Sequence, residues 1–350
     1  MNNKVKEKKA EKTTILDKKD SLVPQKEGVY YPNFYNTPEQ NKSVLKFNDT
    51  HLLSKGGIMT LCAKSGIGKS SVMEAFISSH LNAESDSLGV NLFLGEDHPK
   101  ILFIDTERSK WEVHSAWSKL MKRAILTEND DTSNLLYASL KKLNVLEKRE
   151  YIDSILELNN NIGLVIFDGA SDFLNNTNDM VESNKFIEWI NTFNDNIALA
   201  FTIHTNPTDD KPRGHLGSEL CRKSESVLNA NRQGDIYEIT TDFENGKNRH
   251  GKHESWNYKY CEEQGMFIST KEKPIIKKPN TPIQARWRDL AIKIYAETDA
   301  LPYSYIVEQI QKFANKTQTQ AKNCFMDSWK GKIIEKIIIN DTPFWRLIKQ

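Results

Sequence analysis

The chain has no long apolar run and few cysteines. No window in its 350 residues approaches the roughly 18 consecutive apolar residues of a membrane span, and no apolar segment follows its lysine-rich start. The four cysteines, at positions 62, 221, 261 and 324, form no C-x-x-C pair. This spacing argues against a zinc site and against a disulfide framework. We therefore expect a cytoplasmic chain with no membrane span and no secretory signal.

The chain also lacks a strong net charge, but its charge is unevenly distributed. The formal net charge is +1. Residues 271–350 carry 15 lysines and arginines against 8 acidic residues, whereas residues 51–270 carry 23 against 32. A basic tail on an acidic body suggests contact with nucleic acid, although such a tail can also dock on its acidic neighbour.

In the middle of the chain, apolar runs alternate with helical patterns. The runs at 58–62, 101–104, 162–167 and 197–203 predict strands, and the stretches 70–81, 110–123, 148–158 and 184–193 predict helices. Continuous apolar strands between helices are typical of a parallel sheet that is covered on both faces. Residues 226–268 alternate polar and apolar positions, which predicts an antiparallel extension. The predicted fold class is α/β with a mainly parallel central sheet.

Composition divides the chain into five segments. Residues 1–30 are rich in lysine and glutamate and are expected to be disordered. Residues 31–56 form an N-terminal arm whose aromatic side chains pack on the core or on a neighbouring subunit. Residues 57–270 are the α/β domain, and residues 271–282 are a linker. Residues 283–350 predict three helices, at 283–297, 303–314 and 319–330, and two short strands, which is the outline of a small winged-helix-like domain.

The most informative motif is AKSGIGKS, residues 63–70. It differs by one residue from the phosphate-binding P-loop G-x-x-x-x-G-K-[ST] and lies between an expected strand and an expected helix. The backbone N–H groups of such a loop, with the positive end of the following helix, bind a polyphosphate. Lys69 would reach the outer phosphates of ATP, and Ser70 would ligate Mg²⁺. Ala63 replaces the first glycine, which is tolerated if its φ is negative. The predicted nucleotide-binding residues are Ala63, Lys64, Ser65, Gly66, Ile67, Gly68, Lys69, Ser70 and Ser71.

Two further predicted strands end in carboxylates. The strand LVIFD has the Walker B form, in which Asp168 would hold Mg²⁺, although Asp168 could also be a turn residue. Residues 101–104 lead into Asp105-Thr106-Glu107-Arg108. Because the carboxyl ends of strands face the ligand crevice, Glu107 would orient the attacking water if its strand neighbours the P-loop strand. Asp105 is the rival for that role, and both carboxylates could instead lie on the surface at a helix start.

Further along the sequence, His204 and the pair Lys247 and Arg249 are two more candidate site features. His204 ends the strand 197–203 and would lie beside the γ-phosphate, or it is a structural histidine. Lys247 and Arg249 lie in the turn of the antiparallel extension, where they would insert into a neighbouring subunit's site and neutralise transition-state charge. The simpler interpretation of that pair is an ordinary basic hairpin loop.

The motifs AKSGIGKS, FIDTER, LVIFDG, IHTN and KNRHG, in this order, resemble those of the RecA-like ATPases. The resemblance covers roughly residues 50–260 and is strongest to the DnaB- and RepA-type hexameric helicases and the RadA-like branch. It implies that Glu107 is the catalytic base, that His204 is the polar sensor, and that Lys247 and Arg249 are supplied in trans.

The same resemblance implies a ring or filament of identical subunits, because a residue supplied in trans requires head-to-tail contacts. It also implies a channel-facing loop around residues 213–220, where Arg213 and His215 would meet DNA. No primase or N-terminal helicase domain is recognisable in the sequence.

In the tail, the predicted third helix would be the recognition helix of a winged-helix domain. Gln320, Lys322 and Asn323 would reach DNA bases or phosphates. The alternative is that this domain makes protein contacts.

The leading functional hypothesis is a DNA-dependent ATPase motor, a replicative helicase of a plasmid or mobile element. The second is a non-motor ATP switch that regulates or recruits a replication, transposition or mobilisation complex, and a small-molecule kinase is a weaker third.

Overall fold

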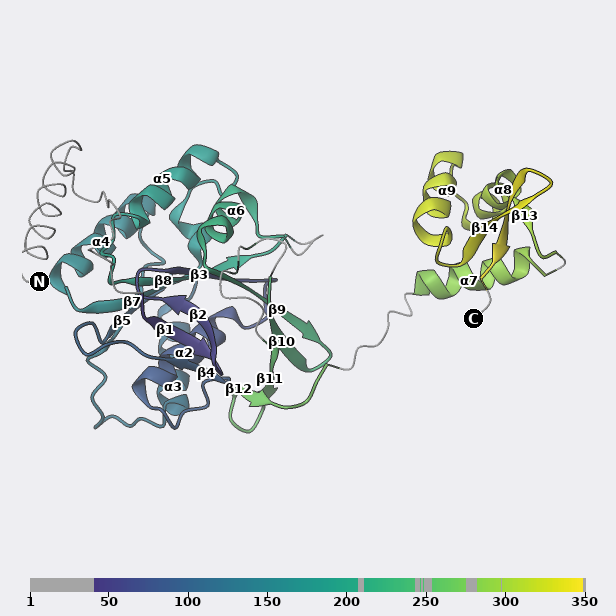
Figure 1. Ribbon diagram of the computed structural model, residues 1–350. Helices are drawn as coiled ribbons and strands as arrows, with labels where there is room; N and C mark the ends of the chain where they lie inside the picture. Colours follow the sequence, from purple (N-terminus) through teal and green to yellow (C-terminus); the bar gives the residue numbers. More distant parts are fainter. Residues whose placement is uncertain are drawn as a thin grey trace, which may run out of the picture.

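The computed structural model describes residues 41–206, 211–242, 246, 248, 254–274, 282–296 and 298–348. A nine-stranded sheet forms the centre of the larger domain (Figure 1). Across the sheet its strands are β12 (Met266–Thr270), β11 (Trp256–Cys261), β10 (Ile236–Thr241), β9 (Ser226–Gln233), β3 (Ile58–Ala63), β8 (Ala198–His204), β7 (Ile162–Asp168), β5 (Lys100–Asp105) and β6 (Leu135–Ser139). From β6 to β9 neighbouring strands are parallel, and from β9 to β12 they are antiparallel. The predicted α/β class, with its mainly parallel sheet and antiparallel extension, is confirmed.

Helices cover both faces of the sheet because the inner strands are apolar at consecutive positions. In β3, Leu61 and Ala63 face one hydrophobic cluster while Cys62 faces the other. The first cluster is covered by α2 (Lys69–Leu81) and α3 (Lys110–Arg123). The second is covered by α4 (Val145–Leu158), α5 (Met180–Ile190) and α6 (Gly214–Lys223) (Figure 1). The carboxyl ends of the parallel strands are therefore left to loops.

A small second sheet packs beside α2. It has the order β2-β1-β4 and consists of β1 (Ser43–Phe47), β2 (Thr50–Ser54) and β4 (Val90–Leu92). Phe47 stacks on Trp256 with ring centroids 4.4 Å apart, and both belong to the first hydrophobic cluster. Residues 43–54, which we expected in an arm, therefore pack on the core of the α/β domain. Residues 1–40 lie outside the described part of the chain.

The structure differs from the sequence prediction around residue 213. The segment 213–220, which the family resemblance implied to be a channel loop, lies almost entirely in α6. Leu216, Leu220 and Cys221 lie on one side of that helix and are buried against the sheet. The apolar spacing of i, i+4 and i+5 forms a helical face, and the two glycines within the segment obscure it in the sequence.

The C-terminal domain has three helices and a three-stranded antiparallel sheet. Its elements are α7 (Pro282–Ile294), β13 (Leu301–Pro302), α8 (Tyr303–Ala314), α9 (Gln318–Cys324), β14 (Ile334–Ile339) and β15 (Thr342–Leu347), with sheet order β13-β15-β14. The helix predicted at 319–330 is interrupted, since a π-helical turn at Phe325–Trp329 follows α9. Phe325 and Trp329 are fully buried in the domain's own hydrophobic core. Among the helices of the described residues, none has the length and apolarity to cross a membrane.

Candidate nucleotide-binding site

Residues 64–68 form a tight loop between β3 and α2. Gly66 and Gly68 have φ values of +78° and +84°, a left-handed conformation that glycine adopts without strain. Gly68 caps α2 without a side-chain hydrogen bond, and the first turn of α2 contains no acidic residue. The N-terminal N–H groups of α2 are thus left for an anion. Ala63 is the last residue of β3 and has no positive φ, so alanine fits there.

The antiparallel extension supports this loop from behind. The Tyr258 hydroxyl on β11 donates a hydrogen bond of 3.0 Å to the Ile67 carbonyl. The ring of Phe267 on β12 lies against Gly68, and a Cβ atom added to Gly68 would lie 2.7 Å from it. Two strands more than 190 residues downstream in the chain therefore set the position of the loop.

Lys69, the first residue of α2, points back over the loop. Its Nζ atom lies 3.5 Å from the carbonyl oxygens of Ala63 and Lys64 and 3.1 Å from Nδ1 of His204. Burial lowers the pKa of Lys69, while the nearby carboxylates of Asp168 and Glu107 act in the opposite direction. A cation held over a glycine-containing loop at the N-terminus of a helix is an arrangement that can bind a phosphate chain.

His204 bridges Lys69 and Glu107. Nε2 of His204 lies 3.6 Å from Oε1 of Glu107, and this contact is the main cause that lowers the pKa of Glu107. A neutral imidazole with its proton on Nε2 satisfies both contacts, because Nδ1 can then accept from Lys69. Three of the residues predicted from sequence, on β8, on α2 and after β5, thus meet at one edge of the sheet.

Asp168 ends β7 at the same edge and is 8% exposed. One oxygen of its carboxylate accepts a hydrogen bond of 2.8 Å from Thr202. Burial raises the pKa of Asp168, whereas the nearby hydroxyls of Ser70 and Thr202 and the charge of Arg108 oppose that effect. A carboxylate and a hydroxyl beside a phosphate site are the oxygen ligands that Mg²⁺ prefers, so Ser70 and Asp168 fit that ion.

Glu107 and Asp105 have different environments. Asp105 is 1% exposed, and its carboxylate accepts from the backbone N–H groups of Glu107 and Arg108 and from the Arg108 side chain. The side chain of Glu107 is 58% exposed. Glu107 is therefore accessible to a water molecule, whereas the carboxylate of Asp105 is buried and hydrogen-bonded within the turn.

We expected Glu107 to reach the site if its strand neighbours the P-loop strand, but the two strands are not neighbours. Its strand, β5, neighbours β7 and β6, so β7 and β8 lie between it and the P-loop strand β3. Glu107 still reaches the site because the turn after β5 directs its side chain toward His204.

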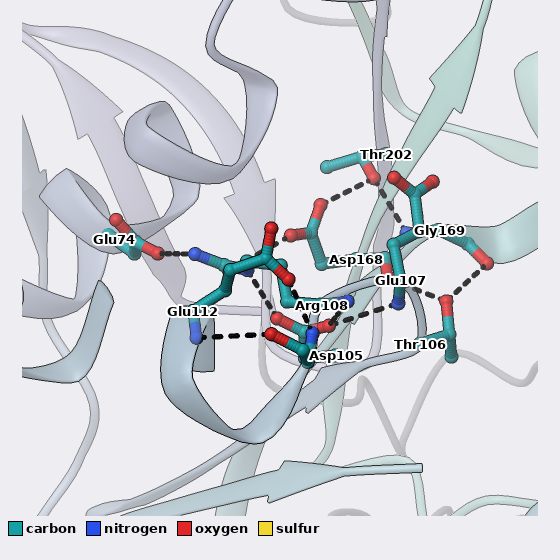
Figure 2. Close-up of polar contacts among 10 residues, drawn as sticks. Glu74, Asp105, Thr106, Glu107, Arg108, Glu112, Asp168, Gly169 and Thr202 are labelled. Atoms are coloured by element: carbon teal, nitrogen blue, oxygen red, sulfur yellow. Dashed lines mark hydrogen bonds and ion pairs between the residues drawn. The ribbon is translucent and has the colours of Figure 1, made fainter. Parts of the chain in front are cut away.

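Arg108 joins the acidic residues of the site (Figure 2). Its guanidinium contacts Asp105, lies 2.8 Å from Glu74 on α2 and 3.4 Å from Asp168. Burial raises the pKa of Glu74 to about 7, although the charge of Arg108 opposes this rise. Sequence reasoning did not single out Arg108, Glu74 or Thr202. In the sequence, Arg108 is distinguished only by its charge and by its position directly after Glu107.

Other predicted site residues are not brought to this edge. Lys247 and Arg249 lie outside the described residues. Between them, Asn248 is buried and its side chain accepts a hydrogen bond of 2.8 Å from the N–H of Val227 on β9. Arg213 and His215 are exposed at the start of α6. The predicted DNA-contacting residues of the tail, Gln320, Lys322 and Asn323, are exposed on α9 of the separate C-terminal domain.

By its sheet and its loop the chain is an α/β protein with a P-loop-like strand–loop–helix unit. No family model matches it, and no curated protein matches it. Among solved structures, a KaiC-like protein of the hyperthermophilic archaeon Pyrococcus horikoshii aligns with 67% of this chain and 100% of its own, at 10% sequence identity and a TM-score of 0.44. That similarity is too low to indicate a function for this chain.

Proposed function

We propose that the chain is a RecA-like P-loop ATPase that binds Mg²⁺–ATP between β3 and α2 and hydrolyses it. The observation that carries this proposal is the convergence of Lys69, His204 and Glu107 beside Asp168. Lys69 and the N–H groups at the start of α2 would hold the phosphates, and Ser70 and Asp168 would hold the metal ion. The bound Mg²⁺ would neutralise charge on the β- and γ-phosphates.

The residues at the end of β5 and β8 would carry the proton chemistry. Glu107 is accessible, and the contact with His204 lowers its pKa, so it is ionised at neutral pH and can accept a hydrogen bond from the attacking water. His204 would hold Glu107 and Lys69 in place and would detect the γ-phosphate through Lys69. Lys247 and Arg249 of a second copy would complete the site, which requires a head-to-tail oligomer.

We also propose that the C-terminal domain is a winged-helix DNA-binding domain. Its order of helices and strands and its antiparallel sheet support this assignment. The exposed face of α9 is polar, because Ala321 and the following Phe325 and Trp329 face the core while Gln320, Lys322 and Asn323 face outward. The excess of basic residues over residues 271–350 favours a nucleic acid as its partner.

From these two parts we infer a DNA-dependent ATPase, with a replicative helicase of a plasmid or mobile element as the leading candidate. The presence of Glu107 favours turnover over a pure ATP switch, which could dispense with a catalytic carboxylate. One argument for a motor was a DNA-contacting channel loop at residues 213–220. Because residues 214–223 form a helix, that argument is lost.

ATP hydrolysis measured with and without single- and double-stranded DNA separates the two candidates. A motor is expected to be stimulated by single-stranded DNA, and Lys322→Gln should lower the slope of log affinity against log salt by about 1, because one phosphate contact is lost. Ser328→Ala, a neutral change after α9, is the control for that slope. Hydrolysis that single-stranded DNA leaves unchanged would favour the switch, and an unaltered slope in Lys322→Gln would contradict the proposed role of α9.

A further inference from the structure

Arg108 is the one arginine of the described residues that contacts three carboxylates from three different elements (Figure 2). Each carboxylate faces a different nitrogen of the guanidinium, with Nε on Asp105, Nη1 on Glu74 and Nη2 on Asp168. A lysine ammonium, with a single nitrogen, cannot reproduce this planar fork. The contacts connect α2, the turn after β5 and the end of β7.

These carboxylates are buried, so their charges need compensation. Glu74, Asp105 and Asp168 are 6%, 1% and 8% exposed. The charge of Arg108 also acts on Glu107, on Glu112 and on Tyr137 of β6, whose buried hydroxyl has no hydrogen-bond partner among the described residues. Without Arg108, three buried carboxylates would lose the one guanidinium that contacts all of them, and such charges repel strongly when water is excluded.

The three contacts of Arg108 differ in length. The contacts with Asp105 and Glu74 are short, whereas the one with Asp168 is 3.4 Å. Arg108 is thus held mainly by Asp105 and Glu74, which lie outside the proposed metal site. The oxygen of Asp168 that faces Arg108 can turn to a cation without breaking the other two contacts.

The same contacts fix the turn that carries Glu107. Asp105 accepts from Nε of Arg108 and, at 3.0 Å and 2.9 Å, from the N–H groups of Glu107 and Arg108. The Thr106 hydroxyl donates to the Asp168 carbonyl at 3.1 Å, which ties the turn to the end of β7. Displacement of Arg108 would therefore move both Asp168 and Glu107.

We propose that Arg108 is a positioning residue. It holds the metal-binding Asp168, the Glu107 turn and the P-loop helix α2 in one fixed arrangement, and it does not touch the nucleotide. This inference rests on the proposed ATPase function. Groups that orient a metal ligand typically contribute about 10- to 100-fold in metal affinity or activity when removed.

The experiment uses the full-length chain and the variants Arg108→Gln, Arg108→Lys, Glu74→Gln and the double variant Glu74→Gln/Arg108→Gln. Three quantities are measured: the unfolding temperature without ligand, the rise in that temperature when Mg²⁺ is added to a non-hydrolysable ATP analogue in place of EDTA, and kcat with KM for ATP. Arg149→Gln is the matched control. Arg149 is a partly buried arginine that hydrogen-bonds the Phe173 carbonyl at 2.9 Å, on α4.

We expect Arg108→Gln to lower kcat about 10- to 100-fold, with a smaller change in KM, and to reduce the Mg²⁺-dependent rise in unfolding temperature. Arg108→Lys should not restore either value, because the fork is lost. The double variant removes one unpaired buried carboxylate and should regain unfolding temperature, but not kcat. Arg149→Gln should lower the unfolding temperature without changing the effect of Mg²⁺.

Two results would overturn the proposal. One is a double variant whose kcat returns to that of Glu74→Gln, which would make Arg108 a structural counter-ion only. The other is an Arg108→Gln variant with the wild-type response to Mg²⁺ and the wild-type kcat. A wild-type chain that binds no nucleotide would instead refute the proposed ATPase, so the two failures are distinguishable.

Discussion

At the scale of single residues, the candidate site depends on where a few charges are placed. His204 lies between a cation and an anion, with Nδ1 toward Lys69 and Nε2 toward Glu107. If Lys69 donates to a bound phosphate chain, as we propose, Nδ1 of His204 would lose its hydrogen-bond donor, and the contact of Nε2 with Glu107 would be the one that remains. A single imidazole can thus connect nucleotide binding to the group that would orient water.

Glu74 gives a prediction for the pH dependence of stability. Burial raises the pKa of Glu74 from 4.5 to about 7, so the folded state binds its proton more tightly than the unfolded state. This contribution to stability is fully present below pH 4.5 and is lost as the pH rises through about 7. Glu74→Gln cannot titrate. The free energy of unfolding of the wild type relative to Glu74→Gln should therefore fall between these pH values, by on the order of 3 kcal/mol.

Chemical denaturation of both proteins at several pH values measures this difference. A difference that stays constant from pH 4.5 to 7 would show that Glu74 does not titrate in that range.

At the scale of elements, the P-loop is held from behind as well as shaped by its own glycines. Gly66 and Gly68 both have positive φ, but only Gly68 has a ring against it, that of Phe267. Alanine at either position should cost roughly 1–2 kcal/mol for the left-handed conformation. Gly68→Ala must also displace Phe267 and should be less stable than Gly66→Ala.

Thermal unfolding of the two variants without nucleotide tests this comparison. The matched pair controls for backbone strain, so equal losses would mean that β12 does not support the loop. Phe267→Leu in the Gly68→Ala background should recover part of the loss, because a smaller side chain leaves room for the new methyl group.

The elements that sequence patterns predicted well are those with strong local signals. The runs 58–62 and 162–167 are buried on both sides, and the helix 110–123 has a capping box from Ser109 and Glu112 at its start. The sequence did not predict β1, β2 or β4, because each is short and β4 pairs with β1, a segment more than 40 residues earlier in the chain. The contact of Arg108 with Glu74 was equally out of reach, since it joins residues 34 positions apart through a tertiary approach of α2.

At the scale of the whole molecule, we propose that a second copy completes the site. Asn248, which stands between Lys247 and Arg249 in the sequence, is buried, and its side chain accepts a hydrogen bond from Val227 on β9, the strand beside the P-loop strand β3. If the two residues act in trans, a subunit with an inactive P-loop can still activate its neighbour.

Mixing two inactive variants tests this arrangement. Lys69→Ala and Arg249→Ala should each hydrolyse ATP poorly, and an equal mixture should regain about a quarter of the wild-type rate, because random head-to-tail assembly pairs an intact P-loop with an intact Arg249 at that frequency. A mixture that is no more active than its components would mean that Arg249 acts in cis or takes no part in the reaction.

The central claim is that Glu107 acts in hydrolysis at a site built by Lys69, Ser70 and Asp168. It is tested most directly by measuring, on one preparation, Mg²⁺–ATP affinity and the single-turnover rate of hydrolysis for the wild type and Glu107→Gln. We predict an affinity within a few-fold of the wild type and a rate lower by about 10²–10⁴-fold, since the amide cannot accept the proton or orient the water as the carboxylate does. Hydrolysis at the wild-type rate by Glu107→Gln would contradict the account.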